Sequence, residues 1–195
     1  MSDNREKFLL TASALMEKQG YCGTGLNEIL EKSGAPKGSL YYYFPDGKEQ
    51  IASEVALRAG KIISGRVQEH TRDRLDTGQA IHDFLYTVAQ RMEETQFQTG
   101  STITMVAMES VTQSERINLA CREAYGMIIG AFKEILIKGR WEPAEAESIA
   151  EMIVAAVEGG IMLSRTYQSA DYLRRVADHI RQMLVSTKNS TLWPK

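Results

Sequence analysis

The chain has 195 residues, of which 43% are hydrophobic, so it can bury a core as one large domain or two small ones. Its formal net charge is -2, which excludes binding to nucleic acid through a large overall excess of basic side chains. Any such binding must therefore rest on local geometry. No run of 18 or more apolar residues occurs, so no membrane-spanning helix or membrane partner is expected.

The first ten residues lack the basic start and unbroken apolar stretch of a signal peptide. The two cysteines, Cys22 and Cys121, lie far apart in the sequence, which is typical of free thiols in a reducing compartment. We therefore expect a cytoplasmic protein.

Composition predicts an all-α fold, because the chain has only four prolines and its long segments consist mostly of helix-forming residues. Gly20 ends the first apolar stripe, the turn Gly34-Ala35-Pro36 separates two short helices, and Thr77 is expected to cap a later one. The expected helices are residues 3–19, 26–33, 37–43, 48–69, 77–97, 105–111, 114–138, 143–167 and 171–185, followed by a tail at 187–195.

Two short helices joined by a tight turn that contains glycine are the signature of a helix-turn-helix, whose second helix enters the major groove of DNA. In the second helix, Leu40 and Phe44 are four residues apart, so they share a face that can anchor the helix. Gly38 has no side chain and would allow the backbone to approach a partner closely.

This region resembles the DNA-binding domain of the tetracycline-repressor (TetR) family over residues 7–55. The matching residues are Gly20, Tyr21, Thr24, Ile29, the run Gly34–Phe44, Lys48 and Glu49. Pro36 and Gly25 depart from the family, which often has a capping serine or threonine at these positions. Gly47 looks like a one-residue insertion that is typical of a subgroup resembling the lincomycin-resistance regulator.

The resemblance implies a transcriptional repressor that binds a palindromic double-stranded DNA operator as a homodimer. Carried over by position, the DNA-binding residues are Thr24, Asn27, Lys37, Gly38, Ser39, Tyr41, Tyr42, Tyr43 and Lys48. Asparagine can pair with adenine, and lysine at a helix start suits a phosphate. The alternatives are that the tyrosines pack inside the protein and that Asn27 is simply solvated.

The resemblance also implies a small, largely apolar effector bound among the long C-terminal helices. The candidate effector-binding residues are Met92, Met105, Met108, Tyr125, Met127, Phe132, Trp141 and Met162. Methionine adapts to ligands of varied shape, but each of these residues could equally belong to an ordinary core. His82 and Glu109 could anchor a polar group of the ligand or have a structural role.

The last two long helices resemble the dimer interface of the family. The expected interface residues are Ile149, Ile153, Ala156, Val157, Gly160, Leu173, Ile180 and Leu184. Gly159-Gly160 would permit close helix approach, and two helices from each subunit would form a four-helix interface.

The expected organisation is a three-helix DNA-binding domain at residues 1–47 and a helical effector and dimerisation domain at 48–195, joined by the helix at 48–69. A regulator whose C-terminal half only dimerises or binds a protein partner remains an alternative. An enzyme is disfavoured because the three histidines are scattered, and no metal, phosphate-loop or nucleophile–base motif occurs. We expect no cofactor and no metal.

Overall fold

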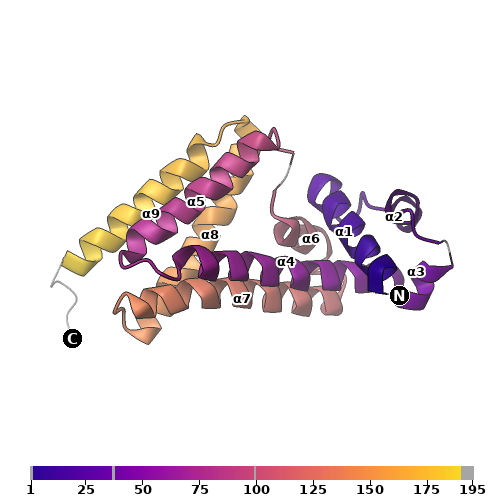
Figure 1. Ribbon diagram of the computed structural model, residues 1–195, viewed down its shortest axis with the longest axis horizontal. Helices are drawn as coiled ribbons and strands as arrows, with labels where there is room; N and C mark the ends of the chain where they lie inside the picture. The colour runs from indigo at the N-terminus through magenta and orange to yellow at the C-terminus, as the bar shows by residue number, and fades with distance from the viewer. Residues whose placement is uncertain (1, 37, 99, 190–195) are drawn as a thin grey trace. The chain divides into compact units, whose positions relative to one another are not determined.

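The computed structural model describes residues 2–36, 38–98 and 100–189. In this part of the chain it has nine α-helices and no strand, which confirms the all-α class (Figure 1). None of the described helices is both long and apolar enough to span a bilayer. The helices are α1 (Ser2–Gln19), α2 (Leu26–Ser33), α3 (Ser39–Tyr43), α4 (Gly47–Thr71), α5 (Thr77–Glu94), α6 (Thr102–Ser110), α7 (Glu115–Lys138), α8 (Pro143–Tyr167) and α9 (Asp171–Asn189).

Three helix boundaries expected from the sequence are wrong by three residues or more. Helix α5 ends at Glu94 rather than residue 97, because Gln96 and Phe97 both have positive φ angles, of 51° and 56°. Helix α6 begins three residues earlier than expected, where the Ser101 hydroxyl accepts a hydrogen bond from the Thr104 amide at 3.3 Å. Helix α9 continues to residue 189 through part of the expected tail, and residues 190–195 lie outside the described residues.

The cap of α5 is Asp76 and not Thr77. Asp76 has an extended backbone, and its Oδ1 accepts a hydrogen bond from the Gln79 amide at 3.0 Å. Thr77 is instead the first helical residue and is buried. Both residue types cap helices well, so adjacent candidates cannot be separated by type alone.

The described residues fold into two compact units, one within residues 1–62 and 100–127 and the other within residues 63–99 and 128–195. Helices α4 and α7 each contribute to both units, and the chain passes between the units three times. The boundary between the two compact units therefore lies within α4. The expected boundary between residues 47 and 48 separates DNA binding from effector binding and dimerisation, and it stays a prediction.

The first unit has a core of apolar side chains to which each of its first three helices contributes. Phe8, Met16, Ile29, Leu40 and Phe44 are all completely buried in it. The rings of Phe8 and Phe44 meet edge to face with centroids 6.2 Å apart, an arrangement that aromatic pairs favour. Helix α1 thus provides the surface on which the short helix α3 packs.

Two ion pairs join α1 to α4 in the first unit. Arg58 contacts the Glu6 carboxylate through both terminal nitrogens, at 2.5 and 2.8 Å, and Arg5 pairs with Glu54. These side chains are partly exposed, so each pair contributes little to the free energy of unfolding. Their fixed geometry orients α1 on α4 more than it stabilises the unit.

In the second unit α5, α8 and α9 pack together (Figure 1). Met92 of α5 lies in a buried cluster with Ala170 and Leu173. Arg174 of α9 forms a two-pronged pair with Glu93 of α5, at 2.6 and 2.9 Å. The helices are therefore joined by apolar packing and by polar contacts at its edge.

Helices α4 and α7 approach very closely at Gly60, where a Cβ atom would lie 2.7 Å from the Cα of Ala124. We predict that Gly60→Ala lowers the free energy of unfolding by about 1–3 kcal/mol, because backbone must move to admit the methyl group. Gly65→Ala, in the same helix with open space around it, should instead raise stability by about 0.5–1 kcal/mol. Urea unfolding of both variants measures this difference, and equal stabilities would contradict the close approach.

Candidate nucleic-acid interface

The loop between α1 and α2 is held by its own backbone and by one buried hydroxyl. Gly20 has a φ of +80°, which favours glycine, and ends α1. The Thr24 hydroxyl donates to the Gly20 carbonyl at 2.7 Å, and the Thr24 side chain is completely buried. In this conformation Thr24 fixes the loop, and its expected phosphate contact stays a prediction.

Helix α2 has Gly25 as its N-cap, with no side-chain cap. Glu28, three residues later, accepts a hydrogen bond from the Gly25 backbone, which is half of a capping box. Hydrogen bonds from Lys32 first and Gln19 next hold the pKa of Glu28 below its usual value. Asn27 lies on the exposed side of the same turn, which agrees with either base contact or simple solvation.

The turn after α2 uses Gly34, whose φ of +63° ends the helix in the left-handed region. Helix α3 then begins at Ser39, with Gly38 as an N-cap that offers no side chain. Lys37, an expected DNA contact and the expected start of this helix, lies outside the described residues. The Ser39 hydroxyl donates to the Pro36 carbonyl at 2.7 Å, so a local hydrogen bond closes the turn.

Helix α3 has two different sides. Leu40 and Phe44 are completely buried, as their spacing predicted. Tyr41 and Tyr42 are 61% and 72% exposed, so they do not serve the core. Tyr43 is half-buried and lies edge-on to Tyr42, with ring centroids 5.1 Å apart. A five-residue helix therefore presents two large amphipathic rings to solvent.

Lys48 is the second residue of α4 and lies beside the α1–α2 loop. Its Nζ lies 4.3 Å from the centroid of the Tyr21 ring, a cation–π contact that positions the ammonium group. Burial, and then the nearby charge of Glu49, raise the pKa of the Tyr21 hydroxyl, so this ring stays neutral. The structure thus brings a fixed cation into the same unit as the exposed face of α3.

The expected effector residues fall in both packing units. Met105, Met108, Tyr125 and Met127 belong to the first unit, and Met92, Phe132, Trp141 and Met162 belong to the second. Met108 is 77% exposed, Met162 is 56% exposed, and Met92 lies in the buried cluster of α5 and α9. Their common role as effector contacts stays a prediction.

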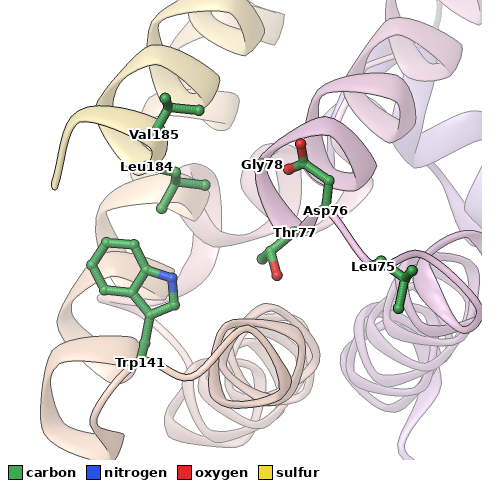
Figure 2. Close-up of a pocket in the computed structure, with 7 residues that line it drawn as sticks. All are labelled: Leu75, Asp76, Thr77, Gly78, Trp141, Leu184 and Val185. Atoms are coloured by element: carbon green, nitrogen blue, oxygen red, sulfur yellow. The ribbon is translucent and has the colours of Figure 1, made fainter. Parts of the chain in front are cut away.

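A groove in the second unit includes one of these residues. It has a volume of about 340 Å³ and is lined by Leu75, Asp76, Thr77, Gly78, Trp141, Leu184 and Val185. Figure 2 shows Trp141 and Leu184 on one side and Asp76 and Thr77 across from them. Its walls are mostly apolar with a single carboxylate, and Leu75 at its edge is fully exposed.

The two polar candidates for a ligand anchor already have protein partners. The His82 ring nitrogens lie 3.2 Å from an Asp83 carboxylate oxygen and 3.0 Å from one of Asp178. The Glu109 carboxylate accepts a hydrogen bond from the Cys22 amide. Sequence periodicity cannot predict the His82–Asp178 and Glu109–Cys22 contacts, because their residues are 96 and 87 positions apart in the chain.

The expected dimer-interface residues divide by burial. Ile153, Gly160, Leu173, Ile180 and Leu184 are buried within the single chain, and a Cβ on Gly160 would lie 3.1 Å from Leu173. Ile149, Ala156 and Val157 are only half-buried. Gly160 therefore permits the close approach of α8 and α9 within one chain. The role of the eight residues in a contact between subunits stays a prediction.

The short helices α2 and α3, their tight turn and the exposed face of α3 define a helix-turn-helix protein, the class that binds DNA in the major groove. Residues 8–55 match the model of the bacterial regulatory proteins of the tetR family, and residues 77–179 match the LmrA/YxaF-like C-terminal domain of transcriptional regulators. The chain belongs to the TetR family of DNA-binding transcriptional regulators. The subgroup expected from the sequence is confirmed as well.

Two relatives from Bacillus subtilis match over almost the whole chain. The HTH-type transcriptional regulator LmrA is 35% identical over 93% of this chain and 97% of its own length. An uncharacterized HTH-type transcriptional regulator, YxaF, is 36% identical over 91% and 93%. The family and these relatives are transcriptional regulators rather than enzymes.

Solved structures agree on the fold. A TetR transcriptional regulator from Legionella pneumophila has a TM-score of 0.80 at 23% identity, covering 91% of this chain and 95% of its own. The regulatory protein TetR from Rhodobacter sphaeroides has a TM-score of 0.81 at 16% identity, covering 91% and 96%. At these identities the likeness establishes the arrangement of helices alone.

Proposed function

We propose that this protein is a homodimeric transcriptional repressor that binds a palindromic DNA operator through the exposed face of α3 and Lys48. The observation that carries the proposal is the division of α3, whose Leu40 and Phe44 are buried while Tyr41 and Tyr42 are exposed. Tyrosine hydroxyls can contact phosphates and bases, and lysine neutralises phosphate. Gly38, Ser39, Tyr43 and Asn27 complete the proposed surface, with Lys37 and Thr24 as further candidate contacts.

We further propose that a small, largely apolar effector bound in the C-terminal half lowers operator affinity. The LmrA/YxaF-like model over residues 77–179 supports a regulatory role for this half. The effector contacts are the eight residues expected from the sequence. Trp141 has the additional support that it lines a mostly apolar groove whose volume suits a small ligand. A C-terminal half that only dimerises or binds a protein partner is the alternative.

The DNA-binding proposal predicts that Tyr42→Ala and Lys48→Ala each weaken operator binding by about 1–3 kcal/mol, because each removes a direct contact. The operator is obtained by selecting sites from a random DNA pool with the purified protein, and affinities are compared at one salt concentration. Arg66→Ala, which removes an exposed charge from the same helix as Lys48, should bind normally. Wild-type affinity in both test variants would rule out this surface as the binding site.

The effector proposal predicts reciprocity. A compound found by its effect on melting temperature, in a screen of aromatic drugs and plant phenolics, should bind the free protein more tightly than the operator complex. The ratio of the two affinities must equal the factor by which the compound lowers operator affinity. Calorimetric titration into both forms measures it, and equal affinities would leave the dimerisation or protein-partner alternative.

A further inference from the structure

Helix α6 and the start of α7 pack in the same unit as the helix-turn-helix, although they follow it by more than fifty residues. Three of their side chains reach the helix-turn-helix segment. Glu109 binds the loop between α1 and α2, while Ser114 and Arg116 bind residues at the start of α4. These three side chains lie outside the 8–55 region that matches the DNA-binding model of the family, whereas the residues that they bind lie inside it.

The Glu109 contact is fitted to the loop. The Cys22 amide donates to Oε2 of Glu109 at 2.6 Å, in an exposed hydrogen bond to a residue that is half-buried overall. A Cβ atom on Gly20 would lie 2.2 Å from Oε1 of the same carboxylate. Gly20 therefore serves two purposes, since it adopts a left-handed φ and leaves the space that the carboxylate occupies.

The held loop leads directly into α2. The Thr24 amide donates to the Tyr21 carbonyl at 3.2 Å, and the buried Thr24 hydroxyl donates to Gly20. The next residue, Gly25, is an N-cap without a side chain, so it cannot bind the first amides of α2, and Glu28 binds only the Gly25 backbone itself. The Glu109 carboxylate of α6 fixes the loop at Cys22 and so restrains the chain just before α2, which the side chain of the N-cap residue cannot do.

The second contact holds the turn from α3 into α4. Arg116 donates to the Asp46 carboxylate at 2.6 Å, and the Ser114 hydroxyl donates to Glu49. Ser114 also accepts from the Ile117 amide at 3.1 Å, so it caps α7 at the same time. The Arg116–Asp46 pair is well exposed and therefore weak. The Glu109 carboxylate instead accepts a charge-assisted hydrogen bond from the Cys22 backbone amide, which is a stronger kind of hydrogen bond than a neutral one.

We propose that Glu109 is a positioning residue for DNA binding. It touches no DNA, but it holds the α1–α2 loop so that α2 and α3 meet the major groove together. Without it the loop at residues 20–24 keeps only its local hydrogen bonds and samples more arrangements, and specific binding loses the free energy needed to restore one of them. Non-specific binding depends mainly on phosphate neutralisation, so it does not need this restraint.

Two substitutions separate the contact from the charge. Glu109→Gln removes the charge but keeps an oxygen that can accept from the Cys22 amide, so operator affinity should stay within about twofold of wild type. Glu109→Asp keeps the charge but is one methylene shorter, so operator affinity should fall by about tenfold, the size expected for losing a hydrogen bond to a charged group. Glu115→Ala, which removes an exposed carboxylate near the start of α7, is the control and should bind normally.

Affinities are measured without any effector, on a selected operator and on random-sequence DNA, with melting temperature and dimer content followed in parallel. The proposal requires that Glu109→Asp lose affinity for the operator alone, while Glu109→Gln keeps it. Wild-type operator affinity in Glu109→Asp, or equal losses in both variants, would overturn it. Operator binding by the wild-type protein is measured first, so failure of this proposal is distinct from failure of the proposed function.

A stability cycle tests the same contact without DNA. Gly20→Ala should destabilise the wild-type protein more than the Glu109→Ala protein, because part of its cost is the displaced carboxylate. Gly34→Ala is the matched control, since Gly34 also has a left-handed φ but no atom within 4 Å of its Cβ position. Its cost should be the same in both backgrounds, and an equal cost for Gly20→Ala in both would overturn the proposal.

Discussion

The burial of Leu40 and Phe44 is the constraint on which the function of this protein depends. Helix α3 has five residues, far fewer than an isolated helix needs to be stable in water. It therefore exists because Leu40 and the residue that caps its C-terminus, Phe44, are completely buried, with the Phe44 ring against Phe8 of α1. The same packing directs Tyr41 and Tyr42 toward solvent. The order of apolar and tyrosine residues in this segment therefore both attaches α3 to the core and exposes the two tyrosine rings.

The charges of the first fifty residues fit this arrangement. Six basic and seven acidic residues leave no general attraction for phosphate. Several of the acids are engaged within the protein, Glu6 with Arg58, Glu28 with Lys32 and Asp46 with Arg116. Affinity for DNA must then come from a few accurately positioned side chains. A small displacement of these side chains should weaken DNA binding more than it would in a strongly basic domain.

The sequence predicted much of the fold because apolar periodicity and helix breakers are local signals. Helix α8 has the bounds expected, since Pro143 suits the first turn and the chain after Tyr167 turns at Gln168 with a left-handed φ. The fold class, the helix-turn-helix and the buried pair of α3 were predicted on the same grounds. These features depend on residues close together in the chain.

What the sequence could not predict depends on contacts between distant residues. Periodicity identified an apolar stripe that includes Leu173 and Ile180, but it could not tell that helices of the same chain cover these side chains. The hydrogen bond from the buried Thr24 hydroxyl to the Gly20 carbonyl depends on the conformation of the loop, which the residue type does not specify. The choice of Asp76 over Thr77 as a cap likewise depended on backbone geometry that adjacent residue types do not encode.

Hydrogen–deuterium exchange with and without a selected operator tests most directly whether α3 and its neighbours form the DNA-binding surface. Bound DNA should slow exchange of amides at residues 21–27 and 38–48, since it covers their backbone and suppresses local opening. A DNA of the same length and scrambled sequence should give weaker protection that disappears as salt is raised. Protection confined to the second unit, with residues 38–48 unchanged at saturating operator, would contradict this account.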